Sequence, residues 1–293
     1  LNEFETSFYA DYYTTDGARL FINADQMSLY DENTSGIFPP ISLAPGSFRE
    51  EQEQFNFSYK FKYLDFTLHG GFFSKHWGPF LTEGYILNEE STEEVEHSYL
   101  ALEYQRFFTE RLEFSGKMYA DVFGGERSEQ VAPGITLSTP SDEWFVYPNG
   151  LVWKYRANGW RIGGETQINY RLFTNNDLTV GAAYEYLAVE DFRIRTNEFN
   201  YIRGFPPDEL HDLADLIPDV QTSSYQTVVS VFVQDKWKIR QNVDLTLGVR
   251  GDLFSDLEEN WGLGGVTPKV GITYQPKSNL NIMSIEVSTN SLY

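Results

Sequence analysis

Two long stretches of this sequence alternate between apolar and polar side chains, and this alternation limits the possible folds more than any other feature. In residues 112–122 the apolar or small side chains occupy the even positions, and most odd positions are polar or charged. Residues 160–172 repeat the pattern. Successive side chains of a β-strand point to opposite faces, so each stretch predicts a strand with one dry face and one wet face.

The connections between the predicted strands alternate between short and long. Strands of about ten residues, with short turns on one side and long loops on the other, are typical of an antiparallel transmembrane β-barrel. This fold class places the short turns in the periplasm and the long loops outside the cell. We predict about twelve strands in six hairpins: 4–13 with 19–30, 53–63 with 66–75, 97–107 with 112–123, 160–173 with 178–188, 226–239 with 243–253, and 266–275 with 280–288. The predicted long extracellular loops are about 31–52, 76–96, 124–159, 189–225 and 254–265.

One local assignment follows from keeping the alternation of short and long connections. Residues 157–159 resemble a turn, which would make residues 151–156 a strand and invert the two sides. We instead assign residues 151–156 to a hairpin inside the 124–159 loop. Residues 207–217 are expected to form a short helix, with Pro218 as its stop.

A soluble β-sandwich also alternates apolar and polar residues, and it is the main alternative fold. The predicted strands, at 10–13 residues, exceed the usual ~5–6 of soluble sheets. The apolar faces of 112–122 and 160–172 carry no charge, as lipid contact requires. Aromatic residues make up 16% of the chain, enough for girdles at two membrane interfaces. Asp235 departs from this pattern because it shares a face with Val233 and Trp237, near a short turn.

The composition excludes several functions. The net charge of −21 argues against nucleic-acid binding, which needs clustered Lys and Arg. The acid concentrates in the predicted loops, where it is expected to keep them solvated. No spacing matches a calcium loop or a zinc site, and no catalytic grouping appears, so we expect no metal, no cofactor and no enzymatic activity.

Two later segments carry a resemblance to a known family. Residues 232–250 contain Phe-Val-Gln-Asp-Lys-Trp, a short turn, and Leu-Thr-Leu-Gly-Val-Arg, and residues 267–274 run from Thr-Pro-Lys to Tyr. These segments resemble the TonB-dependent receptors of Gram-negative outer membranes. The resemblance covers about residues 97–282. Its motif residues, to which we assign structural roles, are Gln234, Asp235, Trp237, Gly248, Arg250 and Pro268.

The resemblance implies a 22-stranded barrel with a plug inside it and a periplasmic TonB complex that drives uptake of a scarce nutrient. This sequence has about twelve strands, and neither a plug nor a TonB-contacting box is visible in it. We therefore expect residues 1–293 to be part of one transmembrane barrel domain. Further chain segments are expected to close it, because open strand edges are not tolerated in lipid.

Candidate ligand-binding residues are the aromatic side chains of the long loops, where burial does not obviously explain them. They are Trp77, Trp144, Phe145 and Tyr147, and packing among the loops is the alternative role for them. The charged residues Lys117, Asp121, Glu165, Arg171 and Arg250 are expected to face the lumen and to pair there with one another or with a plug.

Three functions remain open from the sequence. The first is TonB-coupled uptake of a small nutrient, such as a siderophore–iron complex or a cobalamin, across the outer membrane. The second is a passive porin or channel. The third, an outer-membrane enzyme or adhesin, needs a catalytic pair that the sequence does not offer. The transported substrate cannot be chosen from the residues, because loop shape decides it.

Overall fold

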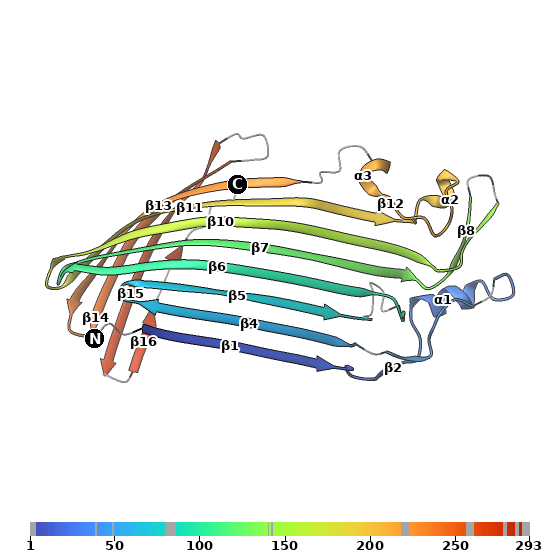
Figure 1. Cartoon of the computed structure of the whole chain (residues 1–293), viewed down its shortest axis with the longest axis horizontal. Helices are drawn as coiled ribbons and strands as arrows, with labels where there is room; N and C mark the ends of the chain where they lie inside the picture. The colour runs from blue at the N-terminus through green and yellow to red at the C-terminus, as the bar shows by residue number, and fades with distance from the viewer. Residues whose placement is uncertain are drawn as a thin grey trace.

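The computed structural model describes residues 4–38, 40–48, 50–79, 86–139, 141, 143–217, 223–255, 261–277, 280–284 and 287–288. Within them, one large antiparallel sheet of long strands dominates, and the helices lie at one end of it (Figure 1). No helix of the described residues is long and apolar enough to cross a membrane. The strands along the sheet are, in order, β1 (Phe4–Thr15), β4 (Gln52–Tyr63), β5 (Phe66–Trp77), β6 (Thr92–Thr109), β7 (Leu112–Ala132), β10 (Leu151–Phe173), β11 (Asn176–Thr196), β13 (Ser224–Arg240), β14 (Val243–Ser255), β15 (Trp261–Lys277) and β16 (Leu280–Ser284).

Smaller elements complete the fold. The helices are α1 (Gln26–Asn33), α2 (Asn200–Arg203) and α3 (Leu213–Leu216). Two small two-stranded sheets lie within the long loops, β2 (Leu20–Ile22) with β3 (Gly46–Phe48) and β8 (Ile135–Ser138) with β9 (Trp144–Tyr147). The short strands β12 (His211–Asp212) and β17 (Val287–Ser288) pair with β11 and β15. In the described part of the chain β1 and β16 are the end strands, so the sheet is not closed.

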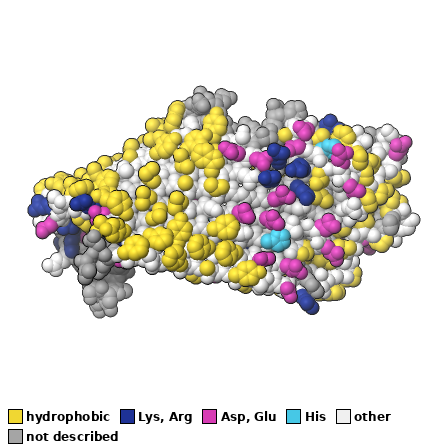
Figure 2. Space-filling view, viewed as in Figure 1, with side chains coloured by type: hydrophobic (Ala, Val, Ile, Leu, Met, Phe, Trp, Pro, Cys, Tyr) yellow, Lys and Arg dark blue, Asp and Glu magenta, His cyan; other side chains and the backbone are white. Residues whose placement is uncertain are grey.

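The register separates an apolar outer face from a polar inner face. Ile168 of β10 lies opposite Phe114 of β7 and Val180 of β11, and Val180 lies opposite Val233 of β13. Their neighbours on the other face are polar, as where Glu165 lies opposite Lys117. Large exposed hydrophobic side chains are numerous on the outer face, and Figure 2 shows them gathered over one part of the sheet. Lipid is the solvent that such a face requires.

The strands are longer than the membrane is thick. On β10 the apolar outer positions run from Leu172 to Trp160, a segment of about 40 Å at about 3.3 Å per residue. A strand tilt of about 40° reduces this to about 30 Å, close to the thickness of the hydrocarbon layer. The Trp160 ring lies 5.1 Å from the Tyr186 ring, tilted by 31°, and marks the girdle on the long-loop side. At the short-turn side Tyr104 lies 4.8 Å from Phe66. Beyond Trp160 the sheet continues past the apolar band on the long-loop side.

The structure corrects several predicted boundaries. β1 does not pair with residues 19–30 but with β4, so residues 16–51 form one long connection and β1 runs toward the long loops rather than toward the short turns. The path therefore holds eleven strands rather than twelve. Residues 151–156 belong to the continuous strand β10, not to a hairpin inside a loop. The helix expected at 207–217 is confined to α3, and Pro218 lies outside the described residues.

The other five predicted hairpins are confirmed, and their strands extend into the segments predicted as loops. β7 continues to Ala132, β10 begins at Leu151 and β11 continues to Thr196, so the predicted loops 124–159 and 189–225 are shorter than expected. Parts of all five predicted loops lie outside the described residues, as does part of the 276–279 turn. The long connections still share one side of the sheet, as predicted (Figure 1).

Candidate functional site: the polar inner wall and the loop layer

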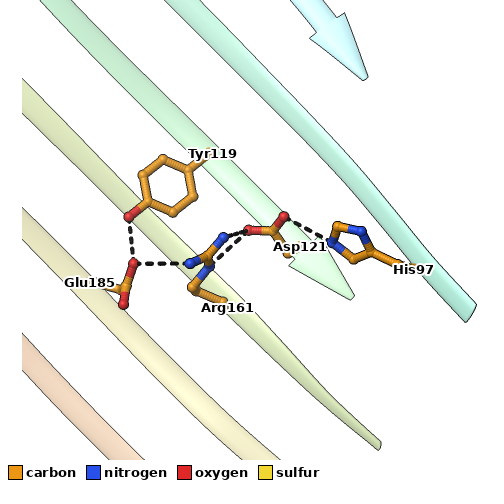
Figure 3. Close-up of polar contacts among 5 residues, drawn as sticks. All are labelled: His97, Tyr119, Asp121, Arg161 and Glu185. Atoms are coloured by element: carbon orange, nitrogen blue, oxygen red, sulfur yellow. Dashed lines mark hydrogen bonds and ion pairs between the residues drawn. The ribbon is translucent and has the colours of Figure 1, made fainter. Parts of the chain in front are cut away.

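A chain of polar contacts crosses four strands on the inner face of the sheet (Figure 3). We call it the inner-wall network, and it consists of His97 on β6, Tyr119 and Asp121 on β7, Arg161 on β10 and Glu185 on β11. Alternation places the members of each strand on the inner face, and the register brings them together, since Arg161 lies directly opposite Asp121. Opposite charges in directly facing positions stabilise a sheet by about 0.2–1 kcal/mol.

Arg161 is the centre of this network. Its Nε donates to Asp121 Oδ2 at 2.9 Å and its Nη2 lies 2.8 Å from the same oxygen, so two guanidinium nitrogens contact one carboxylate oxygen. Its Nη1 lies 3.5 Å from Glu185 Oε2, which also accepts a 2.7 Å hydrogen bond from the Tyr119 hydroxyl. His97 Nε2 lies 3.2 Å from Asp121 Oδ1. Asp121 is 8% exposed, and these partners compensate the burial of its charge.

Polar contacts continue along the inner wall on both sides of this network. Glu103 lies 3.2 Å from His69 and 3.8 Å from Lys117. Further along, Ser230 accepts from Arg250 at 2.8 Å and donates to Asp252 at 2.5 Å. Among the wall residues predicted from the sequence, Lys117, Asp121, Arg171 and Arg250 all form ion pairs with other residues of this chain. Glu165 lies on the same face, opposite Lys117.

Gly163 makes room for one member of the inner-wall network. It lies opposite Tyr119 in the register, and a Cβ atom at this position would stand 2.5 Å from the Tyr119 ring and hydroxyl. The absence of a side chain lets Tyr119 lie across β10 and reach Glu185.

The loop layer is anchored by buried aromatic and amide side chains. Tyr147 of β9 is fully buried and packs with Ala132 and Leu151. Its hydroxyl donates to the Glu198 carbonyl at 3.2 Å and accepts from the Tyr201 amide at 3.0 Å, which joins two separate loops. Burial raises the pKa of the Tyr147 hydroxyl above its ordinary value. The hydroxyl therefore stays protonated and keeps its donor role.

Asn197 links the same loops through its side-chain amide. Its oxygen accepts from the Val152 amide at 2.9 Å, and its nitrogen donates to the carbonyls of Gly150 and Pro207 at 3.0 and 2.8 Å. The residue is 2% exposed, and its three bonds use both N–H donors and one acceptor site of the amide. The loop layer is therefore an ordered structure above the girdle.

Asp25 fixes the connection between β1 and β4. It caps α1 by accepting from the Ser28 amide at 2.8 Å, and it also accepts from the Ser42 hydroxyl at 2.7 Å and the Leu87 amide at 3.0 Å. Burial alone would raise the pKa of this carboxyl, but the hydrogen bonds from Leu87, Ser42 and Ser28 outweigh burial and lower the pKa below 3.8. The carboxylate thus ties the first long connection to the next.

The aromatic residues proposed from the sequence occupy different environments. Trp144 is 62% exposed and lies edge-to-face with Phe38 at 4.9 Å, and Phe145 beside it is partly buried. Trp77 packs beside the buried Phe48 and Leu87, beneath the Lys75 ammonium group at 4.6 Å. Tyr147 is buried, as described above. The structure brings Phe145 and Tyr147 together at 5.1 Å but places Trp77 in a separate cluster.

The motif residues lie on β13, β14 and β15. Gln234 faces Gly248 across the pair, and Pro268 lies opposite Val249. Asp235 lies on the outer face close to the short turn, where it accepts a hydrogen bond from the Asn176 side chain. This hydrogen bond compensates the charge of Asp235, the carboxylate that departs from the apolar pattern of this face. Trp237 is 44% exposed beside it, and Arg250 belongs to the inner wall.

The arrangement offers hydrogen bonds and charge rather than a reactive group. Within the described ranges, no three His, Cys, Asp or Glu side chains are grouped so as to hold a metal ion. His69 and His97 both belong to the inner wall, although the sequence predicted no role for either of them. Cross-strand register was the missing information, because their partners lie 34 and 24 residues away in sequence. A wall of this kind can guide a polar solute.

The fold, the apolar band and the polar inner face together define an outer-membrane β-barrel wall. Comparison with known proteins identifies its family. Residues 2–289 match the family model described as "TonB dependent receptor-like, beta-barrel". The chain therefore belongs to the TonB-dependent receptor family, which lies in the outer membrane and carries out non-enzymatic transport. No curated protein matched the sequence.

Solved structures share the fold at low sequence identity. A mutant of the ferric enterobactin receptor from Pseudomonas aeruginosa matches with a TM-score of 0.56 and 13% identity, over 94% of this chain and 37% of its own. The siderophore receptor PirA from Acinetobacter baumannii matches with a TM-score of 0.51 and 15% identity, over 94% and 36%. The copper transporter OprC matches with a TM-score of 0.55 and 12% identity, over 94% and 39%. The chain thus spans well under half the length of these proteins.

Proposed function

We propose that this protein takes part in the uptake of a scarce nutrient across the outer membrane, with energy delivered by a TonB complex acting through a plug. The nutrient class we propose is a metal chelate, such as a siderophore–iron complex, or a cobalamin of similar size. The solved relatives include receptors for ferric enterobactin and siderophores and a copper transporter, which supports this class.

The observation that carries the proposal is the continuous polar inner wall beneath an ordered loop layer. Side chains from β5 to β14 present hydroxyl, amide, carboxylate and guanidinium groups to the lumen. Many of these groups already pair with one another, so the wall offers weak, exchangeable contacts rather than a tight site. Weak contacts at several levels suit passage of a solute, because a tightly held solute would not leave.

We propose that the loop aromatics Trp144 and Phe145 make the first contact with the nutrient. Trp144 is exposed on β9, and Tyr147 in the same strand is anchored by two loop hydrogen bonds. A rigid strand with an exposed indole suits stacking on a flat aromatic or corrin-like group. Tyr147 then has a supporting role, and Trp77 belongs to a second loop cluster.

The test is uptake by cells that carry the full-length gene, with a panel of labelled ferric siderophores and cobalamin. We expect one panel member to accumulate, and a protonophore to abolish its accumulation. The double variant Trp144→Ala/Phe145→Ala should lower binding of that nutrient about tenfold. Phe107→Ala, an exposed aromatic at the short-turn end, serves as the matched control.

Conductance separates this proposal from passive diffusion. In planar bilayers the purified protein should show no large steady current. A large steady current, together with uptake that a protonophore leaves unchanged, would establish a porin-like channel and overturn the proposal.

A further inference from the structure

The inner face of the sheet carries a surplus of carboxylates toward its long-loop side. From the level of the inner-wall network upward, the described strand residues of this face are five carboxylates, Asp11, Glu93, Asp121, Glu129 and Glu185, and three cations, Lys75, Arg127 and Arg161. We propose that this surplus selects the charge of the transported solute, and that the solute is a ferric chelate of uncharged type that carries a protonated amine. This inference rests on the proposed uptake function and names its substrate class.

The three cations of this face are already engaged by groups of the same chain. Arg161 is held between Asp121 and Glu185, as Figure 3 shows. Arg127 forms an ion pair with Glu129, which is only 7% exposed. The Lys75 ammonium group lies 4.6 Å from the centre of the Trp77 ring. An anionic chelate would have to displace one of these partners, and leaving a buried carboxylate unpaired is costly.

Two of the five carboxylates are left without a cation. Asp11 accepts a hydrogen bond from the Asn56 side chain at 3.0 Å, a neutral partner. Glu93 lies opposite Arg127 in the register, but the Arg127 ion pair goes to Glu129. Neither Asp11 nor Glu93 forms an ion pair with another residue that the structure describes. A carboxylate is an acceptor only, so these two groups suit a solute that brings its own N–H donors and positive charge.

An aromatic surface lies beside Glu93 on the same face. Trp153 and Tyr155 of β10 stack with their ring centres 6.1 Å apart and their planes 21° apart, and both rings are half-buried. The face of an indole ring attracts an ammonium group. Lys75 on Trp77 is an example of this contact within the chain itself. Glu93 and Trp153 belong to strands two apart in the sheet, about 10–12 Å from each other at about 4.8 Å per strand, so one compact chelate can contact both.

The long connections on this side of the sheet add to the same electrostatic preference. Residues 83–96 contain six Glu, residues 208–219 contain five Asp or Glu, and neither segment contains Lys or Arg. An entrance lined by charges of one sign raises the local concentration of solutes of the opposite sign and lowers that of like-charged solutes. The entrance and the upper inner face therefore favour a cation at two successive stages of entry.

The charge of a ferric chelate depends on its ligand groups. Three hydroxamates neutralise a ferric ion, whereas three catecholates leave the complex triply negative. A trihydroxamate with one free amine is therefore a cation near neutral pH, because the amine is protonated there. The inner face described above accommodates such a cation and opposes the catecholate. One solved relative is a receptor for ferric enterobactin, a tris-catecholate, so this inference assigns the present chain to a different chelate class.

The test measures chelate binding to the full-length protein purified in detergent, by titration calorimetry. The probes are ferrioxamine B, a trihydroxamate with a free amine, its N-acetylated form, and ferric enterobactin. We expect the N-acetylated form to bind about tenfold more weakly than ferrioxamine B, and ferric enterobactin more weakly still. Raising the salt concentration from about 0.05 to 0.5 M should narrow these differences.

The outcomes separate this inference from the proposed function. Ferric enterobactin binding as tightly as ferrioxamine B would overturn the inference, and so would equal binding of the two trihydroxamates or binding of none of the three chelates. Energised uptake of another nutrient, such as cobalamin, would leave the proposed function standing in each of these cases. Uptake that a protonophore leaves unchanged would instead overturn the proposed function.

Matched variants locate the binding residues. Glu93→Lys should weaken ferrioxamine B binding at least about tenfold and tighten ferric enterobactin binding. Glu94→Lys makes the same charge change one residue away, on the outer face, and should leave both affinities within about threefold. Trp153→Leu should weaken ferrioxamine B binding about fivefold, whereas Trp160→Leu, on the outer face of the same strand, should not change it. Should Glu93→Lys not fold, Glu93→Gln removes the charge alone. Unchanged binding in folded Glu93 and Trp153 variants would overturn the assignment.

Discussion

Tyr147 joins two loops on the long-loop side through one hydroxyl group, and removal of this hydroxyl should loosen those loops without loosening the sheet. Tyr147→Phe keeps the buried ring but removes the bonds to the Glu198 carbonyl and the Tyr201 amide. Both groups then face the buried phenyl ring without a partner there, since the Tyr147 side chain is fully buried. An unsatisfied buried polar group costs about 1–3 kcal/mol. Partial relaxation of the loops lowers the expected total cost for the carbonyl and the amide together to about 2 kcal/mol. This cost raises the equilibrium constant for local opening of the loops roughly thirtyfold.

Hydrogen exchange measured by mass spectrometry tests this value. Peptides that contain the Tyr201 amide should exchange about thirtyfold faster in Tyr147→Phe, whereas peptides from the membrane-spanning part of β10 should not change. Tyr13→Phe is the control, because Tyr13 is half exposed and makes no hydrogen bond among the described residues. Unchanged exchange at Tyr201, or equal acceleration across the sheet, would refute the hub role of this hydroxyl.

Three further predictions concern charge and membrane contact. The pKa of Asp25 lies below 3.8 in the folded chain, so its stabilisation of the 16–51 connection is complete above that pH and is lost as the pH falls through the lowered value. Limited pepsin digestion between pH 5 and pH 2, expressed relative to cleavage of an unfolded reference peptide, should show cleavage there rising with acidity, and Asp25→Asn should lose this dependence. Arg161→Gln should lower thermal stability in detergent by about 1–2 kcal/mol, and Arg161→Lys should restore only part of it, because Lys lacks the two-bond geometry; full restoration by Lys would contradict that geometry. Ala182→Arg on the outer face should cost about 2–4 kcal/mol of folding free energy in lipid, measured by urea titration, whereas Ala183→Arg beside Glu165 should cost much less; equal costs would mean that the two faces are not distinguished.

The sequence predicted the membrane-spanning part of the sheet well, because lipid imposes a pattern that the residues must obey. Within the bilayer every outward side chain of 160–172 has to be apolar or small, so alternation reveals both the strand and its faces. Above Trp160 the outward face meets water and carries Glu126 and Arg156. The apolar alternation ends there although β7 and β10 continue. Residues 157–159 also resemble a turn, and keeping the alternation of short and long connections placed residues 151–156 in a loop hairpin rather than in β10.

The predicted pairing of residues 4–13 with 19–30 was wrong for a different reason. Asp16-Gly17 resembles a hairpin turn, and local turn chemistry alone favours pairing residues 4–13 with 19–30. The partner of β1 is instead β4, which begins at Gln52. Only the pairing energy of whole strands decides between these two partners. The inner-wall network was likewise beyond prediction, since the contact of Arg161 with Asp121 spans 40 residues and depends on register.

The most direct test of the account asks which face of the sheet contacts lipid. The chain contains no cysteine, so single cysteines at positions 180 to 184 of β11 can each carry a nitroxide label without a background signal. In lipid vesicles, labels at 180, 182 and 184 should be accessible to oxygen, and labels at 181 and 183 should be accessible to a water-soluble nickel complex. Accessibility to the nickel complex at all five positions, or the opposite alternation, would contradict a sheet whose apolar face is the membrane wall.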